Sequence, residues 1–174
     1  MGALRRDTKE TQITVRLDLD GVGQTSVSTG VGFLDHLLDA LARHGRFDLD
    51  VEATGDLHID THHTIEDVAI VLGRAFNQAV GDAAGIVRMG EATVPLDESL
   101  VQAVVDISGR PFAAVELPFA GEMIGQMPTE MVRHFLRSFA TEARITLHVR
   151  LLAGGGGRRL PGDDPLRRDL DEGS

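Results

Sequence analysis

The 174-residue chain contains no cysteine, no tryptophan and no tyrosine, and each absence narrows the chemistry open to it. Without cysteine there are no disulfides and no thiolate ligands, so a metal would have to be held by His, Asp and Glu. Seven phenylalanines are the whole aromatic content. That leaves little material for the stacking platforms that bind single-stranded nucleic acid. The missing cysteine is also what a cytoplasmic protein would show.

Positive charge and long apolar runs are scarce as well. Lys and Arg number 17 against 27 Asp and Glu, a formal net charge of −10, which disfavours nucleic acid and anionic membranes as partners. The first residues contain no apolar core of a signal peptide, and no run approaches the roughly 20 apolar residues of a membrane span. We therefore expect a cytoplasmic domain in which an anionic substrate is held by a local basic cluster.

Hydrophobic periodicity predicts a regular order of elements in the first half of the chain. Alternation of apolar and polar residues predicts strands, and leucines at helical spacing predict helices. The predicted elements are strands over 12–20 and 24–29, a helix over 34–44, a strand over 47–53 and a helix from Thr61 or Thr64 to Gly81. Two glycines between the first two strands predict a hairpin.

The second half of the chain repeats this order. Its predicted elements are strands over 92–96 and 100–108, a helix over 129–140 and a strand over 145–152. The pair Asp35-His36 on the first predicted helix corresponds to Arg133-His134 on the second. Self-similarity on this scale indicates a duplication with pseudo-twofold symmetry. We expect a first half over 1–86, a second half of the same domain over 87–153, and a tail over 154–174.

The repeat breaks down in the tail. The sequence HHTIED (62–67) lies opposite RRLPGD (158–163), and only the first is followed by a long apolar helix. The residues after 163 include Pro165, several acids and two leucines, which provide no apolar helical stripe. We expect a degraded terminal helix in the second half and a disordered Gly-rich and acidic tail.

The cluster His62, His63 and Glu66 has the composition of a metal site. On a helix, Glu66 shares a face with both histidines, at spacings of four and three residues. Adjacent imidazoles point in different directions and so serve two metals better than one, and imidazole with carboxylate suits Mn, Fe, Zn or Ni alike. His36 and His134, at matching repeat positions, strengthen this interpretation. The alternative is a surface pair of histidines without function.

Other polar residues carry weaker signals. Glu10 precedes the first predicted strand and is either a general base or a solvated charge. Arg88 and Arg110 lie near glycines, where a guanidinium can reach a phosphate. The remaining histidines have no symmetry-related partners and are expected to be structural or solvent-facing; they are His44, His58 and His148.

Several motifs, in order and spacing, resemble imidazoleglycerol-phosphate dehydratase over roughly residues 5–153. The segments are RDTKET (6–11), TGVGFLDHLLDALARHGRFDL (29–49), GDLHIDTHHTIEDVAIVLGRA (55–75), GIVRMGEATVPLDESL (85–100), VDISGRP (105–111) and TEMVRHFLRSFA (129–140). The long motif around His62 is the most specific of them.

The resemblance implies an α+β fold of two pseudo-symmetric halves, each a β-sheet layer packed on helices. This is a duplicated βαβ-type arrangement similar to the second domain of ribosomal protein S5 (ribosomal-S5-domain-2-like). It also implies a homo-oligomer of 24 subunits with two Mn²⁺ ions in each active site between subunits. The implied reaction is dehydration of D-erythro-imidazole glycerol 3-phosphate to imidazole acetol phosphate in L-histidine biosynthesis. The small phosphorylated imidazole substrate would be the partner, without nucleic acid or membrane.

The resemblance also implies roles for individual residues. It places the metal ligands at His36, His62, His63, Glu66 and His134. It places the acid/base glutamate at Glu10, and phosphate contacts at Arg88 and Arg110.

The tail departs from the family pattern, which carries a second H-H-x-x-E motif followed by an aromatic residue and a lysine. Here the aligned positions hold Arg158, Arg159 and Gly162, with Leu166 in place of the lysine. Guanidinium groups stay protonated and do not ligate metals. Either a frameshift or sequence error near codon 154 or true divergence explains the change. Both predict an impaired dehydratase.

Two other functional classes remain at this stage. One is a catalytically inactive, truncated or diverged paralogue that serves as a structural subunit, which purified-chain turnover distinguishes from an enzyme. The other is an unrelated metallohydrolase, which would cleave simple phosphoesters; the order of the motifs argues against it.

Overall fold

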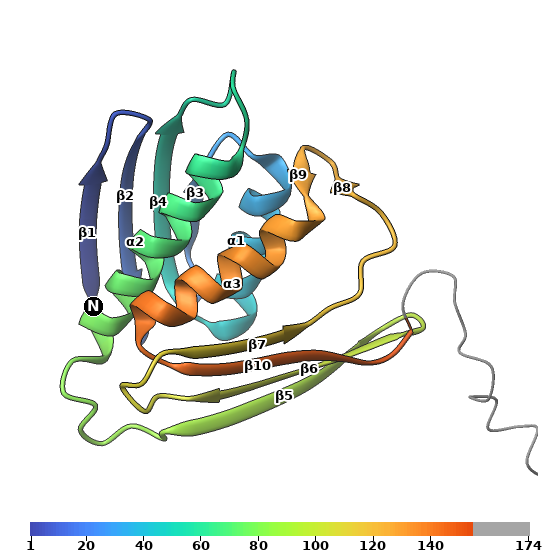
Figure 1. Ribbon diagram of the computed structural model, residues 1–174. Helices are drawn as coiled ribbons and strands as arrows, with labels where there is room; N and C mark the ends of the chain where they lie inside the picture. Colours follow the sequence, from blue (N-terminus) through green and yellow to red (C-terminus); the bar gives the residue numbers. More distant parts are fainter. Residues whose placement is uncertain (155–174) are drawn as a thin grey trace, which may run out of the picture.

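The computed structural model describes residues 1–154, which form two four-stranded sheets with three helices between them (Figure 1). The fold is therefore α+β in two layers of sheet, as the sequence predicts. The predicted tail lies almost wholly in residues 155–174, outside the described residues. In the described part of the chain, no helix is long and apolar enough to cross a membrane.

The first sheet has the strand order β1-β2-β4-β3. Its strands are β1 (Gly2–Asp7), β2 (Thr11–Asp18), β3 (Thr25–Ser28) and β4 (Asp48–Gly55). Two helices belong to this half, α1 (Gly32–Gly45) and α2 (His62–Val80). Alternation along β2 buries Ile13, Val15 and Leu17 beneath the helices, while the residues between them lie on the outer face.

The second sheet has the order β5-β6-β10-β7. Its strands are β5 (Met89–Leu96), β6 (Ser99–Asp106), β7 (Phe112–Glu116) and β10 (Thr146–Ala153). A short hairpin of β8 (Met123–Ile124) and β9 (Met127–Pro128) leads into α3 (Thr129–Ala143). Helix α3 packs on this sheet through Ala140 and Ala143, which join Leu147 and Val149 of β10 in a second core cluster.

The two sheets have the same topology, strand for strand. In both, the first pair and the central pair are antiparallel, and the last pair is parallel. Helices α1 and α3 also end alike: Arg46 and Arg144 adopt the left-handed conformation, and each N–H bonds to carbonyls of the last turn. The predicted pseudo-symmetric halves are thus present, with equivalent positions 98 residues apart in α1 and α3 (144 − 46) and 88 residues apart in the first two strands of each sheet (90 − 2). The exact division at residue 86 stays a prediction; it falls between α2 and β5.

Helix α2 breaks the symmetry of the described residues. It lies over β1 and β2 and packs along α3 (Figure 1). Nothing in residues 1–154 occupies the equivalent place over β5 and β6. The inner side of the second sheet is consequently less covered: all of β5 is exposed.

The predicted hairpin of the first two strands was wrong, and two strands were not predicted. The segment 24–29 does form a strand, but β3 pairs in parallel with β4 and does not form a hairpin with β2. The hairpin partner of β2 is β1, which sequence periodicity missed because its burial pattern includes the inward-facing Arg6. Strand β7 was also missed; it is a short edge strand with only Val115 fully buried.

Candidate metal centre

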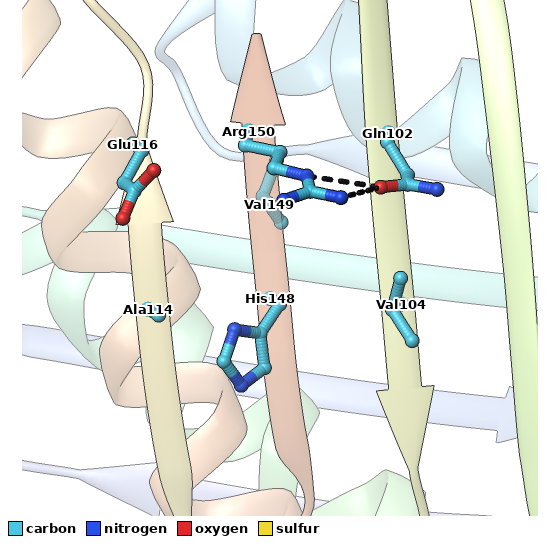
Figure 2. A pocket seen from close by; sticks show the side chains of 7 residues that line it. All are labelled: Gln102, Val104, Ala114, Glu116, His148, Val149 and Arg150. Carbon is cyan, nitrogen blue, oxygen red and sulfur yellow. Dashed lines mark hydrogen bonds between the residues drawn. The ribbon is translucent and has the colours of Figure 1, made fainter. Parts of the chain in front are cut away.

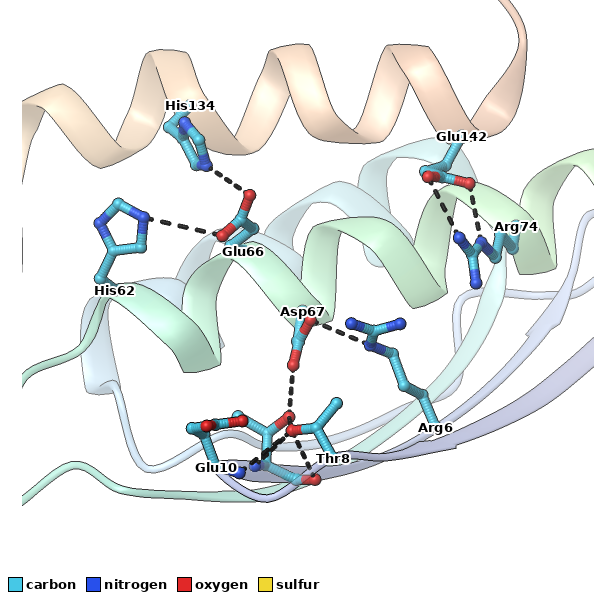
Figure 3. A network of polar contacts seen from close by, with 10 residues as sticks. Arg6, Thr8, Glu10, His62, Glu66, Asp67, Arg74, His134 and Glu142 are labelled. Atoms are coloured by element: carbon cyan, nitrogen blue, oxygen red, sulfur yellow. Dashed lines mark hydrogen bonds and ion pairs between the residues drawn. The ribbon is translucent and has the colours of Figure 1, made fainter.

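The candidate centre lies where the first turns of α2 and α3 face each other. Thr61 precedes α2, and the Asp60 carboxylate accepts a hydrogen bond from the His62 backbone N–H at 2.8 Å, so a local acid anchors the helix start. Glu66 follows one turn later on the same face, as the four-residue spacing predicts. His134 approaches from α3 (Figure 3).

Three of the five predicted ligands meet at this point. Nε2 of His134 lies 3.0 Å from Oε1 of Glu66, and Nε2 of His62 lies 3.7 Å from Oε2 of the same carboxylate. The two imidazole ring centroids are 5.1 Å apart. One ligand atom from each residue lies within 4.8 Å of the others, so two imidazole nitrogens and a carboxylate converge on one small volume.

The state of His134 supports a metal at this point. Its Nε2 atom is buried and has no hydrogen-bond partner among the described residues, because the nearby Glu66 oxygen has the distance but not the geometry of a bond. A buried polar atom without a partner is costly. A divalent cation between His134, Glu66 and His62 would satisfy it, and this donor set suits a first-row transition metal. The residues present therefore fit a metal.

His63 points to a different neighbourhood. Its ring is 6.2 Å from that of His62 and nearly perpendicular to it, at 78°. Nδ1 of His63 lies 3.0 Å from Oδ2 of Asp56. This hydrogen bond, with smaller contributions from Asp60 and Glu10, raises the pKa of His63. A carboxylate on Nδ1 leaves Nε2 as the ligating nitrogen, an arrangement common around metal-binding histidines.

Glu10 and His36 do not join the three-residue cluster. Glu10 lies in the turn between β1 and β2, on the opposite side of α2 from Glu66 (Figure 3). It is close enough to His63 to act on its charge. His36 is exposed on α1, next to Asp39, whose pKa is lowered chiefly by hydrogen bonds from Thr25 and Arg43.

The two predicted phosphate-binding arginines lie together at the start of β5 and the end of β6. Arg88 forms a two-pronged ion pair with Asp106, at 2.6 and 2.8 Å. This pairing raises the pKa of Arg88 and lowers that of Asp106, and the charge of Arg110 contributes to lowering the pKa of Asp106. This edge lies at the end of the molecule away from the start of α2 (Figure 1). Within one chain, the arginines and the histidine cluster are separate.

A buried carboxylate that the sequence analysis missed connects the β1–β2 hairpin to α2. Asp67 accepts a hydrogen bond from Arg6 at 3.0 Å and another from the Thr11 hydroxyl (Figure 3). Thr8 in turn accepts the Thr11 N–H at 2.9 Å. The sequence offered one signal for this carboxylate: Asp67 is an acidic residue within the apolar stripe predicted for α2. Its partners lie about 60 residues away and carried no pattern.

A shallow hollow on the outer face of the second sheet is unrelated to this centre. It is lined by His148, Arg150 and Gln102, with Arg150 donating to the Gln102 side-chain oxygen at 2.8 and 3.0 Å (Figure 2). His148 is exposed there, and His44 and His58 are exposed as well.

An α+β fold of two pseudo-symmetric halves, with a His/Glu cluster between two helices, is compatible with the class of metal-dependent enzymes. Comparison with known proteins narrows the class. The family model described as imidazoleglycerol-phosphate dehydratase matches residues 29–158. The chain belongs to this family of hydro-lyases.

Individual relatives and a solved structure support the same family. The chain is 58% identical over 151 residues to the imidazoleglycerol-phosphate dehydratase of Gluconacetobacter diazotrophicus, covering 87% of this chain and 76% of the relative. It is 57% identical over 155 residues to that of Streptomyces avermitilis, covering 88% and 79%. The crystal structure of the Staphylococcus aureus dehydratase superposes with a TM-score of 0.79 at 35% identity, covering 88% of this chain and 85% of that one.

Proposed function

We propose that this chain is built to dehydrate D-erythro-imidazole glycerol 3-phosphate to imidazole acetol phosphate, and that it is impaired by its altered tail. Family membership supports a dehydratase role in histidine biosynthesis. The observation that carries the proposal is the convergence of His62, Glu66 and His134, with the unpartnered Nε2 of His134 between them.

In this proposal the metal ligands form two groups. His62, Glu66 and His134 would hold one Mn²⁺, and His63, oriented by Asp56, would contribute with His36 to a second. A bound divalent metal supplies Lewis acidity at the imidazole of the substrate. A division into two ligand groups agrees with the nearly perpendicular rings of His62 and His63, which point in different directions.

The remaining residues bind the substrate and move its proton. Glu10 accepts the carbon-bound proton, and the substrate hydroxyl departs with a proton as water, leaving an enol that becomes the ketone. Arg88 and Arg110 hold the phosphate, where binding energy far from the reacting carbon positions the substrate. Arg88 is paired with Asp106 in the free chain, so phosphate would compete with that carboxylate.

The separation of the arginines from the histidine cluster supports an active site assembled from more than one copy. The particle of 24 subunits, with sites between subunits, is part of this proposal. A homo-oligomer would bring the β5–β6 edge of one copy to the α2–α3 crossing of another.

The proposed impairment rests on the sequence of the tail. Arg158 and Arg159 replace two imidazoles, and Gly162 replaces a carboxylate, in the second motif of the family. The match to the family model ends at Arg158. Loss of direct metal ligands is more severe than the roughly 10–100-fold loss typical of changes to groups behind the ligands.

The test is dehydratase turnover with added Mn²⁺ by two purified chains. One is the chain as it stands; the other carries H-H-x-x-E and the aromatic–lysine pair within residues 158–166, followed by a full apolar helix. We expect turnover at least roughly 100-fold higher in the restored chain. Glu66→Gln in the restored chain serves as the matched control and should abolish the gain.

Full activity of the unaltered chain would contradict the impairment while leaving the dehydratase assignment intact. Inactivity of both chains, with Mn²⁺ bound and folding unchanged, would instead favour a structural subunit without catalysis.

A further inference from the structure

The internal symmetry of the molecule identifies a place that corresponds to that of α2 but has no helix over it in residues 1–154. Helix α2 lies over β1 and β2 and packs along α3. The symmetry-related place lies over β5 and β6, beside α1. We call this place the open groove. The residues that correspond by symmetry to those around α2 are Ala92, Val94, Val101 and Ala103 on the strands and Leu37 and Leu41 on α1.

The strand wall of the groove is apolar and faces inward. Ala92 pairs with Ala103 and Val94 with Val101, so cross-strand neighbours point to the same side of the sheet. Val101 and Ala103 pack against the second core cluster, which identifies that side as the inner one. Val94 is nevertheless 60% exposed. In the first sheet the equivalent of Val101 is Ile13, fully buried beneath α2.

A pair of equivalent glycines shows how closely a helix fits. Gly2 of β1 pairs with Leu17, and Gly90 of β5 pairs with Val105, which is the symmetry equivalent of Leu17. Gly2 and Gly90 are therefore equivalent positions. A methyl group added at Gly2 would collide with the backbone of Ala75 in α2, whereas at Gly90 it would meet nothing within 4 Å. Both sheets thus have a glycine at the position of close approach, but in residues 1–154 only the first sheet has a helix against it.

The helical wall shows the same difference. Phe135 and Phe139 of α3 pack against the main core beside α2, and the rings of Phe139 and Phe76 are 5.8 Å apart. Their equivalents on α1, 98 residues earlier, are Leu37 and Leu41. These leucines are 38% and 51% exposed. Two independent walls therefore lack the same partner within residues 1–154.

We propose that the open groove binds an amphipathic helix with the apolar spacing of α2, supplied by a second polypeptide. Helix α2 shows which apolar spacing fits such a groove, because it fills the equivalent place in the first half with Val68, Val71, Leu72 and Ala75. The sequence after β10 contains prolines at 161 and 165 and has no apolar stripe at helical spacing comparable to that of α2. A helix-in-groove contact of this kind depends on apolar anchors three and four residues apart.

The probe is a fluorescein-labelled peptide with the sequence of residues 61–81, acetylated and amidated, titrated with the full chain in EDTA. EDTA removes metal binding by the peptide histidines, so the outcome is independent of the proposed dehydratase activity. We expect saturable 1:1 binding by fluorescence anisotropy and a higher melting temperature of the chain. A peptide carrying Val68→Asp and Leu72→Asp should not bind.

Matched protein variants locate the site. Val94→Glu and Leu41→Glu, both at exposed positions, should weaken binding at least tenfold. Thr93→Glu, on the same strand but the outer face, should leave it within twofold. Circular dichroism should be the same for all three. Absence of binding to the full chain, or equal effects of Val94→Glu and Thr93→Glu, would overturn the proposal. A dimer that Val94→Glu disrupts, that Thr93→Glu leaves intact and that the peptide does not dissociate would also overturn it, because a second copy would then be the occupant.

Discussion

At the scale of single residues, the most informative side chain is one that takes no part in metal binding. Asp67 follows Glu66 directly but points to the other side of α2, where it holds Arg6 and Thr11 of the β1–β2 hairpin. We expect these bonds to restrain the rotation of α2 about its axis, because they tie one face of the helix to the hairpin. That rotation determines where Glu66 points.

Replacing Asp67 should therefore affect stability first. Asp67→Ala leaves Arg6 and the Thr11 hydroxyl without their acceptor, which should lower the free energy of unfolding by about 2 kcal/mol. Asp67→Asn retains an acceptor and should cost less. Urea unfolding followed by far-ultraviolet circular dichroism measures both, since the chain has no tryptophan. Equal stability of Asp67→Ala and the unaltered chain would show that the network is unimportant.

A second carboxylate gives a pH-dependent prediction. Asp48 Oδ1 accepts backbone N–H groups from Val22, Gly23 and Gln24, at 2.8, 3.0 and 2.9 Å, and these bonds lower its pKa in the folded chain. A lowered folded-state pKa stabilises the fold above the unfolded-state value, and this stabilisation is lost as pH falls through the folded-state value. Asp48→Asn should thus be less stable than the unaltered chain at pH 7.

The stability difference should shrink in acid. Melting temperatures measured from pH 7 down to below pH 3 should converge for Asp48→Asn and the unaltered chain. A difference that stays constant with pH would mean that the charge of Asp48 contributes nothing to the hydrogen bonds.

Sequence reasoning could group candidate ligands on one helix more readily than candidates from different elements. The spacing of His62 and Glu66 fixes their shared face because both lie on one helix. His134 comes from another helix, and only the repeat alignment pointed to it. The Asp56 contact of His63 spans a loop, for which no periodicity exists, and a buried pair such as Arg6 and Asp67 is a property of tertiary packing.

At the scale of elements, the α2–α3 crossing positions the candidate centre. Gly73 sits where the two helices come closest: a methyl group there would lie 2.7 Å from the Phe139 carbonyl oxygen and 3.0 Å from the Ala143 nitrogen. Arg74, the next residue, is paired with Glu142 of α3 at 2.7 Å. The crossing thus depends on a small residue flanked by an ion pair.

Gly73→Ala tests this crossing. Helix propensity alone predicts a gain of about 1 kcal/mol, but overpacking against backbone costs about 1–3 kcal/mol. We expect net destabilisation and weaker Mn²⁺ binding, because His134 would move away from Glu66. Asn77→Ala, at an exposed position of the same helix, is the control and should be neutral or slightly stabilising. A more stable Gly73→Ala with unchanged Mn²⁺ affinity would contradict the tight crossing.

Helices were easier to predict than strand partners, for a physical reason. A helix satisfies its hydrogen bonds locally, so the patterns ending at Gly81 and near residue 45 locate α2 and α1 closely. A strand needs a partner that the sequence does not specify. Residues 24–29 consequently form a strand as predicted, yet pair with β4 after the intervening helix α1.

At the scale of the whole molecule, duplication has produced two halves of unequal packing. The main core cluster includes 16 buried residues, from the first sheet, α1 and the residue before it, α2, β9 and the start of α3, whereas the cluster on the second sheet has six. The halves share Phe76 and Phe139, which pack against both clusters. Because burial is the main favourable term in folding, the second sheet should be the weaker unit.

Native-state hydrogen exchange resolves this difference strand by strand. Local openings have free energies that range from near zero up to that of global unfolding. We expect the slowest amides in β2 and β4, exchanging only by global unfolding, and faster exchange in the β5–β6 pair through partial opening. Strand β10 should be intermediate, since it pairs with β6 but lies beneath α3. Uniform protection of β2 and β6 would show instead that the two halves unfold as one cooperative unit despite their unequal cores.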